Sequence, residues 1–230
     1  MIEVTEFVYY ADLAGIAVFA ATGVLAAQGR QIDMFGVIVL AIVTALGGGT
    51  LRDLCLNAHP LIWIADPVLL WTAVIAALFT FAVCRYRPYP RRALLTLDAA
   101  GLALFAVAGA EKALSLGFTP TIAVVMAVVT GCAGGMIRDL MTVRIPGILR
   151  HDEFYATCAL LGAIFYVSLH GIIESGLLAL ITIAIIFIVR MLAIVLELRL
   201  PVFVLAGMDH PPRLPRLLRR LFKKSKHPEE

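Results

Sequence analysis

Charge is scarce in this chain of 230 residues. Asp, Glu, Lys and Arg together make up 15% of the sequence, whereas soluble globular domains carry about 25%. Hydrophobic residues account for 61% of the chain, and they form runs of about the 20 residues that a helix needs to cross a bilayer. The composition therefore excludes a soluble domain and predicts an all-α membrane protein.

Cysteine and catalytic motifs are equally sparse. Cys55, Cys84, Cys132 and Cys158 form no CxxC pair and have no histidine at ligand spacing, which excludes the usual disulfide and metal patterns. No Ser-His-Asp arrangement, His-Glu-x-x-His motif or phosphate-binding loop is present. We therefore predict a protein that is not an enzyme and has no metal site or cofactor. From the apolar composition we predict membrane lipids, and not nucleic acid, as its partners.

Seven apolar spans can be read along the chain. They cover residues 8–27, 34–59, 67–85, 94–113, 120–145, 154–171 and 174–197. Arg190 and Glu197 come late in the last span, where a long side chain can extend to water at the bilayer surface.

One segment occurs twice. The sequence GGTLRDL at 48–54 returns as GGMIRDL at 134–140, a shift of 86 residues, and the same shift lays spans one to three on spans four to six. Because three is an odd number, the second copy must enter the membrane from the opposite side, which predicts an inverted repeat. The predicted organisation is a first three-helix repeat, a second inverted repeat, a seventh transmembrane helix and a basic cytoplasmic tail, at residues 1–90, 91–172, 173–200 and 201–230.

Basic residues in the short loops predict the orientation. They follow the third span, the fifth span and the seventh span, at Arg85, Arg87, Arg91, Arg92, Arg144, Arg150 and along the tail from Arg213 to Lys226. All three positions lie on one side of the membrane if the N-terminus is outside. We therefore expect a multi-pass protein of the cell (inner) membrane with a cytoplasmic C-terminus.

The duplicated motif suggests a break in two membrane helices. Gly47, Gly48 and Gly49 lie near the middle of span two, and each glycine weakens a helix by about 1 kcal/mol relative to alanine. Local unwinding there would leave polar helix ends facing protein or water, with carbonyls suited to a cation and amides suited to an anion. Arg52 and Asp53 would then occupy the first turn beyond the break.

Span five repeats this arrangement with Gly134 and Gly135 followed by Arg138 and Asp139. Under inverted symmetry the two breaks would approach each other near the midplane and line one pore. The alternative is that these glycines serve only close helix packing and that each Arg-Asp pair is structural.

Other polar residues recur at the same shift. Asp12 and Asp98 near the starts of spans one and four are interpreted either as helix caps or as partners of Arg52 and Arg138. Thr44 and Thr130, each four residues before a motif, are further candidates for supporting that site.

These motifs resemble one known family. Gly-Gly-Gly-Thr-Leu-Arg-Asp at 47–53 and Gly-Gly-Met-Ile-Arg-Asp at 134–139, each preceded by an Asp-Leu-Ala-Gly or Asp-Ala-Ala-Gly segment, are similar to the prokaryotic branch of the trimeric intracellular cation (TRIC) channels. The resemblance covers all seven spans. It implies seven transmembrane helices, an inverted three-plus-three repeat and a homotrimer with one pore per subunit. It also implies passive K⁺ conduction, with Na⁺ passing too, along helices two and five.

The motif residues assigned to this pathway are those that match the family: Gly47, Gly48, Gly49, Arg52, Asp53, Gly134, Gly135, Arg138 and Asp139. Animal members carry a Lys-Glu-Val element tied to phosphoinositide binding, and Thr50-Leu51-Arg52 stands at the comparable place, so that regulation is not expected here. Bacterial members have also been labelled glycine transporters. A carrier of glycine or a similar zwitterion is therefore the alternative, and a silent scaffold is the third hypothesis.

Overall fold

The computed structural model describes residues 4–86, 89–150 and 154–198. The basic tail predicted at 201–230 lies outside them. Within these ranges the chain is almost entirely helical, in the order α1 (Val4–Ala27), α2 (Met34–Cys55), α3 (Ile62–Ala65), α4 (Pro67–Tyr86), α5 (Arg91–Ser115), α6 (Pro120–Met141), the 3₁₀ turn η1 (Gly147–Leu149), α7 (Ala156–Leu169) and α8 (Ser175–Leu196).

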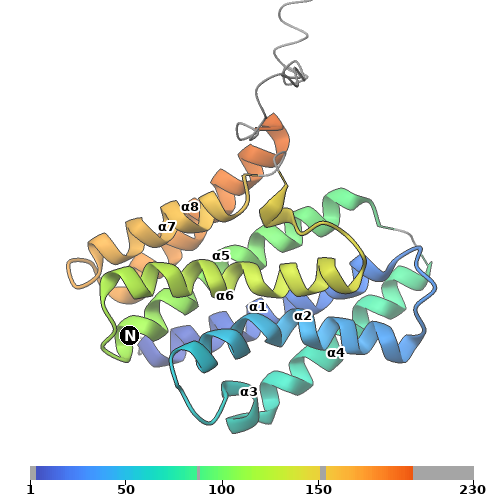
Figure 1. The fold of residues 1–230 in the computed structure, drawn as a ribbon, viewed down its shortest axis with the longest axis horizontal. Helices are drawn as coiled ribbons and strands as arrows, with labels where there is room; N and C mark the ends of the chain where they lie inside the picture. The colour runs from blue at the N-terminus through green and yellow to red at the C-terminus, as the bar shows by residue number, and fades with distance from the viewer. Residues whose placement is uncertain (1–3, 87–88, 151–153, 199–230) are drawn as a thin grey trace, which may run out of the picture.

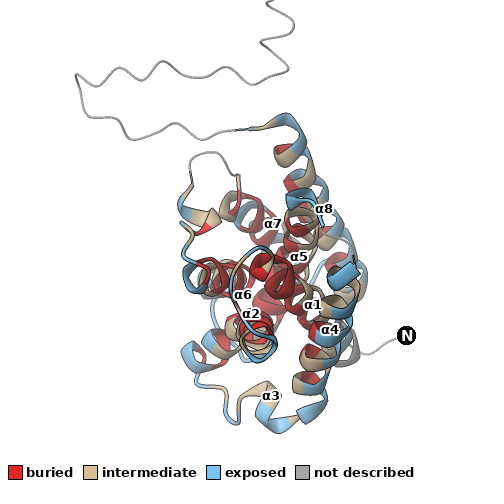
Figure 2. Ribbon diagram, turned by 90° about the vertical axis from the view of Figure 1, so that its right-hand side faces the viewer, coloured by how far each residue is buried: buried red, intermediate tan, exposed pale blue. Residues whose placement is uncertain are grey.

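Six of the described helices are long and apolar enough to cross a membrane, and α7 is a shorter apolar helix of 14 residues. The seven predicted spans are therefore all found as helices. α4 shows why they suit lipid: it buries only Leu69, Ala73 and Ala77, one stripe at helical spacing. Trp71 and Phe79 on its other faces are exposed. Figure 2 shows the buried residues gathered on the inner faces of α1, α2, α5 and α6.

Two of the predicted spans were too long, because α2 ends at Cys55 and α6 at Met141. Both helices end in the same way. Asn57 and Val143 have left-handed backbone conformations, each with φ of 52°. The next amide then donates back to the carbonyl five residues earlier, from Ala58 to Asp53 and from Arg144 to Asp139, as in a Schellman-type helix end.

α5 lies at the centre of the bundle and contacts α1, α6, α7 and α8 (Figure 1). Its crossing with α1 is reciprocal: a side chain at Gly15 would meet the ring of Phe105, and one at Gly101 would meet the ring of Phe19. The two phenylalanine rings have centroids 5.2 Å apart. Gly15 and Gly101 are equivalent positions of the two repeats, and so are Phe19 and Phe105. The glycine of each repeat therefore contacts the phenylalanine of the other, which is the pattern that a two-fold axis produces.

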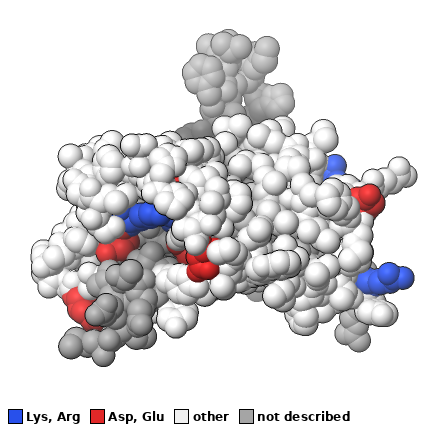
Figure 3. All heavy atoms as spheres, turned by 90° about the horizontal axis from the view of Figure 1, so that it is seen from below, with Lys and Arg blue, Asp and Glu red and all other residues white. Residues whose placement is uncertain are grey.

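The loops divide into two groups at opposite ends of the bundle. At one end the Tyr89 amide donates to Gln28 Oε1 over 3.0 Å, which joins the turn after α1 to the segment before α5. At the other end Lys112 near the end of α5 pairs with Asp53 near the end of α2. The face drawn in Figure 3 shows charged atoms toward both ends, with a broad uncharged stretch between them.

Candidate functional site: two buried arginine–aspartate networks

The glycines of both motifs lie where α2 crosses α6. A side chain at Gly48 would overlap the carbonyl oxygen of Thr130, and one at Gly134 would overlap the carbonyl oxygen of Thr44. The hydroxyls of these two threonines bond within their own helices, to Leu40 and Met126. Thr44 and Thr130 are therefore part of the helix crossing and do not contact the arginines.

The predicted breaks are absent, and this part of the sequence interpretation was wrong. α2 runs as a helix through Gly47, Gly48 and Gly49, and α6 runs through Gly134 and Gly135. The three glycines of α2 cost helix propensity, but they allow the two backbones to touch, and lipid offers no partner for amides freed by unwinding. The half-helix ends proposed to bind ions therefore do not exist in this structure.

The Arg-Asp pairs lie in the last turns of α2 and α6 instead of beginning new half-helices. An arginine near a helix C-terminus interacts favourably with the negative end of the helix dipole. Because the two helices run in opposite directions, the pairs lie at opposite ends of the bundle, with Asp53 facing Lys112 and Asp139 near Arg144. The glycines of the two motifs meet, whereas their charges are kept apart.

Arg138 is the centre of the second network and is 3% exposed. Its Nη1 donates to Asp98 Oδ1 over 2.6 Å and to the Thr22 hydroxyl over 3.1 Å, and its Nη2 donates to Asp139 Oδ1 over 3.0 Å. Asp139 also accepts the Gly147 amide through Oδ2 at 3.1 Å. Buried charges are stable only when they are paired and hydrogen-bonded. Arg138 meets both conditions.

Arg52 is the centre of the first network and is completely buried. Its Nε donates to Asp53 Oδ1 over 2.9 Å, but its Nη1 lies 3.6 Å from Asp12 Oδ1, beyond hydrogen-bond distance. Among the described residues neither terminal nitrogen of Arg52 nor either carboxylate oxygen of Asp12 has a hydrogen-bond partner. Lys112 adds a second cation, with Nζ 2.9 Å from Asp53 Oδ1.

Asp12 and Asp98 are therefore partners of the two arginines. The interpretation of them as helix caps was wrong, because α1 begins at Val4 and α5 at Arg91, which places both aspartates well inside their helices. The network around Arg138 is compact and the one around Arg52 is looser, although the same residue types occupy equivalent positions.

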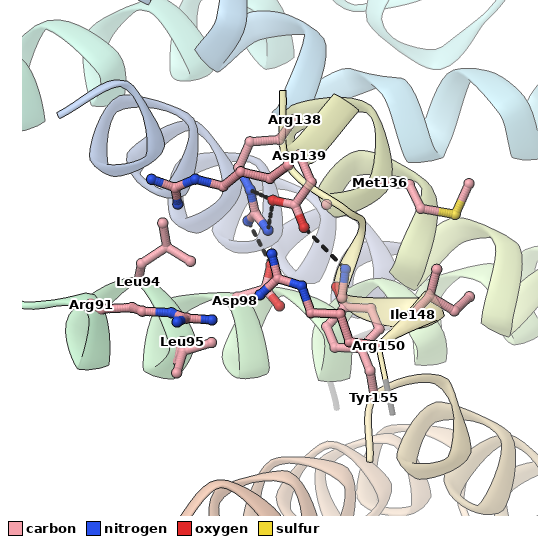
Figure 4. Close-up of a pocket in the computed structure, with 13 residues that line it drawn as sticks. Arg91, Leu94, Leu95, Asp98, Met136, Arg138, Asp139, Ile148, Arg150 and Tyr155 are labelled. Atoms are coloured by element: carbon pink, nitrogen blue, oxygen red, sulfur yellow. Dashed lines mark hydrogen bonds and ion pairs between the residues drawn. The ribbon is translucent and has the colours of Figure 1, made fainter. Parts of the chain in front are cut away.

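A small pocket opens beside the second network (Figure 4). It offers about 30 Å³, enough for at least one water molecule. Asp98, Arg138, Asp139 and Tyr155 line its inner part, and further arginines from α5 and the η1 region line the rest, at Arg91, Arg144 and Arg150. Burial and the positive charges of Arg30 and Arg91 lower the pKa of the Arg144 guanidinium. The guanidinium nevertheless stays charged at neutral pH, because the ordinary pKa of arginine is far above 7.

Sequence reasoning missed several residues of these networks. Thr22 and Lys112 contact the motif charges, and the Arg190 guanidinium lies 4.9 Å from the ring centroid of Tyr155. Arg190 is 1% exposed, so it does not extend to water as predicted. One signal was available: Lys112 follows Asp98 by 14 residues, four helical turns, and so lies on nearly the same face of α5.

Neither network has the composition of a bound-metal centre. No group of three or more His, Cys, Asp or Glu side chains that could hold a metal ion occurs among the described residues. The carboxylates of Asp53 and Asp139 are each shared with the neighbouring arginine.

Comparison with known proteins agrees with these observations. A family model described as "Glycine transporter" matches residues 9–85 and 95–171, two segments offset by the same 86 residues. The inner membrane protein YadS of Escherichia coli K12 is 41% identical over 201 residues, which are 86% of this chain and 97% of YadS.

Solved structures give the same result. The TRIC trimeric intracellular cation channel orthologue from Rhodobacter sphaeroides is 40% identical, with a TM-score of 0.79 over 83% of this chain and 98% of that one. A prokaryotic TRIC channel crystallised in 0.5 M KCl is 28% identical, with a TM-score of 0.75 over 81% of this chain and 95% of that one. Together with the six long apolar helices, these similarities identify a multi-pass membrane protein.

Proposed function

This chain belongs to the prokaryotic TRIC channel family, and from that membership we propose that it conducts monovalent cations passively across the cell membrane. The proposed permeant ions are K⁺ and Na⁺, with one pathway per subunit along α2 and α6. Nothing in the sequence resembles the Thr-Val-Gly-Tyr-Gly filter of potassium-selective channels, so we propose weak discrimination between the two ions.

One observation carries the proposal: charged groups that membrane helices rarely contain are buried at both ends of the same helix pair. Arg52 and Asp53 lie at one end, and Arg138 and Asp139 at the other. Charges inside transmembrane segments are costly and generally mark ion or substrate pathways. Asp53 would attract cations at one mouth of the pathway and Asp139 at the other. The neighbouring arginines would keep divalent ions from binding tightly.

The contact between α2 and α6 at Gly48 and Gly134 supports a closed state. Conduction then requires the two helices to separate at the crossing or ions to pass beside it. Because interfaces of small residues have little side-chain material to rearrange, a small relative movement of the helices would change the width of this route.

The assembly and orientation are also part of the proposal. The trimeric channel from Rhodobacter sphaeroides supports a homotrimer, and the long apolar helices support membrane lipids as its surroundings. The clustering of Arg30, Arg91, Arg144 and Arg150 toward one end of the bundle supports a cytoplasmic location for that end, with the N-terminus outside.

Recording from the purified protein in planar bilayers under a KCl gradient tests this function. With K⁺ on one side and a large organic cation on the other, a channel gives unitary currents whose reversal potential lies near the equilibrium potential of K⁺. The Asp53→Asn variant is expected to reduce the amplitude of these currents. Uptake of labelled glycine by proteoliposomes is the parallel arm, because the family model names glycine transport. Saturable glycine uptake without unitary currents would reject the channel.

A further inference from the structure

We propose that the contact between His170 and Glu111 is a proton-operated latch. When His170 is protonated, the latch ties the turn between α7 and α8 to the end of α5 and favours the closed channel. The inference deepens the proposed function and rests on it for the effect on conduction. The latch lies at the end of the bundle where α2 also ends, which the proposed orientation places outside the cell.

Groups from three segments meet at one oxygen atom of Glu111. The Tyr166 hydroxyl of α7 donates to Glu111 Oε2 over 2.5 Å, and His170 Nε2 lies 3.5 Å from the same atom. The Glu111 side chain is 8% exposed, whereas the His170 side chain is 34% exposed. A buried carboxylate with one hydroxyl donor therefore faces an imidazole that water can reach.

The backbone fixes His170 in this place. Residues 170–174 alone separate α7 from α8 (Figure 1). The amides of Ile172 and Ile173 both donate to the Leu169 carbonyl oxygen, over 3.1 and 3.3 Å. Gly171 has φ of 82°, a left-handed conformation that glycine adopts without strain. The imidazole is therefore held against α5 by a tight turn.

His170 has few charged neighbours. α7 carries no Asp, Glu, Lys, Arg or His. The charges of α6 and α8 lie toward the opposite end of the bundle, at Arg138, Asp139 and Arg190. On α5, Glu111 is followed by Lys112, whose ammonium group pairs with the end of α2. The Glu174 carboxylate lies at the first turn of α8, beside Gly176. Within the described ranges, Glu111 is thus the acidic group that His170 contacts.

The first repeat has no such cluster. The shift of 86 residues carries the three positions of the cluster back to Leu25, Thr80 and Cys84. These residues also lie together, because they line one apolar pocket between α1, α4 and α5. The duplicated fold therefore brings the three positions together without needing ionisable groups there, and the acidic and imidazole groups are an addition specific to the second repeat.

Protonation changes the nature of the contact. At 3.5 Å a neutral imidazole makes no good hydrogen bond to Glu111, whereas an imidazolium carries a full charge and two N–H donors. Histidine is the side chain whose charge ordinarily changes near pH 6.5. Because the carboxylate is buried, water screens this ion pair less than a fully exposed one. Acid therefore strengthens the attachment of the turn to α5.

The attachment bears on conduction because α5 packs along α6, one of the two helices proposed to line the pathway. The latch is formed in the same structure in which Gly48 and Gly134 close the helix crossing. A proton that binds this structure more tightly than an open one shifts the population toward it. Acid on this side of the membrane is therefore expected to close the channel.

Thermal unfolding of the full-length protein in detergent tests the latch without reference to conduction. The two pH values lie on either side of the ordinary histidine titration, at about 5.5 and about 8. We expect His170→Gln to lower the unfolding temperature by about 2–4 °C more at the lower pH. The sign follows because stability linked to a protonated histidine is present at low pH and is lost as the pH rises.

Three further variants make the outcome specific. Glu111→Gln removes the other partner and is expected to show the same pH-dependent loss. Tyr166→Phe keeps both partners of the latch, so any loss of stability should be equal at the two pH values. His59→Gln removes an exposed histidine from the loop after α2 and should behave as the wild type. The inference is overturned if His170→Gln loses equal stability at both pH values, or if Glu111→Gln keeps the wild-type pH dependence.

Recordings separate this inference from the proposed function. In bilayers the open probability of the wild type is expected to fall several-fold when the pH on the latch side is lowered from about 8 to about 5.5, and that of His170→Gln to stay constant. A conducting protein in which both respond alike overturns the inference and leaves the channel intact. If the wild type carries no current, the proposed channel fails, and the thermal measurement still decides whether the latch binds a proton.

Discussion

Gly48 and Gly134 make the same contact in opposite directions, since each lies against the backbone carbonyl oxygen of the threonine four residues before the other glycine. The contact places α2 and α6 backbone to backbone at the centre of the duplicated fold. Neither glycine has room for a methyl group, so both helices depend on glycine at this crossing.

Replacing either of these glycines by alanine is therefore expected to destabilise the protein. Gly48→Ala and Gly134→Ala each drive a Cβ into a carbonyl oxygen, and overpacking of this kind costs about 1–3 kcal/mol. Thermal unfolding in detergent measures the loss. Gly49→Ala is the matched control from the same triplet, because its Cβ would have only ordinary contact, 3.8 Å from Arg52 Nη2. Equal losses for Gly48→Ala and Gly49→Ala would contradict the crossing.

The two arginine networks predict unequal responses to equivalent substitutions. Asp98→Asn removes the negative charge that lies 2.6 Å from a buried arginine, and breaking a buried ion pair costs about 3–5 kcal/mol. Asp12→Asn acts on a pair separated by 3.6 Å whose facing atoms form no hydrogen bonds, so its cost should be clearly smaller. Unfolding temperatures of the two variants, compared side by side, test this order, and a larger loss for Asp12→Asn would refute it.

Tyr155 offers a test of how α8 is attached to the second repeat. Its ring faces the Arg190 guanidinium, whereas its buried hydroxyl has no hydrogen-bond partner among the described residues. Tyr155→Phe keeps the ring and should change stability little. Tyr155→Leu removes the aromatic face and should cost about 1–2 kcal/mol, the value of a desolvated cation–π contact. Indistinguishable unfolding of Phe and Leu variants would show that the ring contact contributes nothing.

Cys55 provides a native probe of membrane orientation. It is exposed at the end of α2, while Cys132 and Cys158 are buried. With the N-terminus outside, a membrane-impermeant maleimide should label intact cells or spheroplasts at Cys55, and Cys55→Ser should abolish the labelling. Labelling of Cys55 that appears only after permeabilisation would reverse the proposed orientation.

Much of the fold was predictable because bilayer-length apolar runs leave few alternatives to a helix. The duplication predicted which helices are equivalent. The ends of α2 and α6 were placed about four residues late, because each helix ends before a residue in the left-handed conformation, Asn57 or Val143, that the sequence pattern did not mark.

The glycine motifs show where sequence reasoning fails. Helix propensity favours unwinding at three adjacent glycines, whereas close packing favours a continuous helix, and the choice depends on whether another backbone lies opposite. The partner of Gly48 is at Thr130, more than 80 residues away. The pairing of Lys112 with Asp53 has the same origin, because nothing local links two residues on different repeats.

The buried Ala26 at the position that corresponds to Lys112 makes the two mouths of the bundle chemically unlike. A cation arriving from one side would meet an ammonium group, and one arriving from the other side would not. Current along the proposed pathway through a single oriented molecule should therefore rectify, even though α2 and α6 are related by near-symmetry. Vesicles with proteins inserted in both directions would average this preference away.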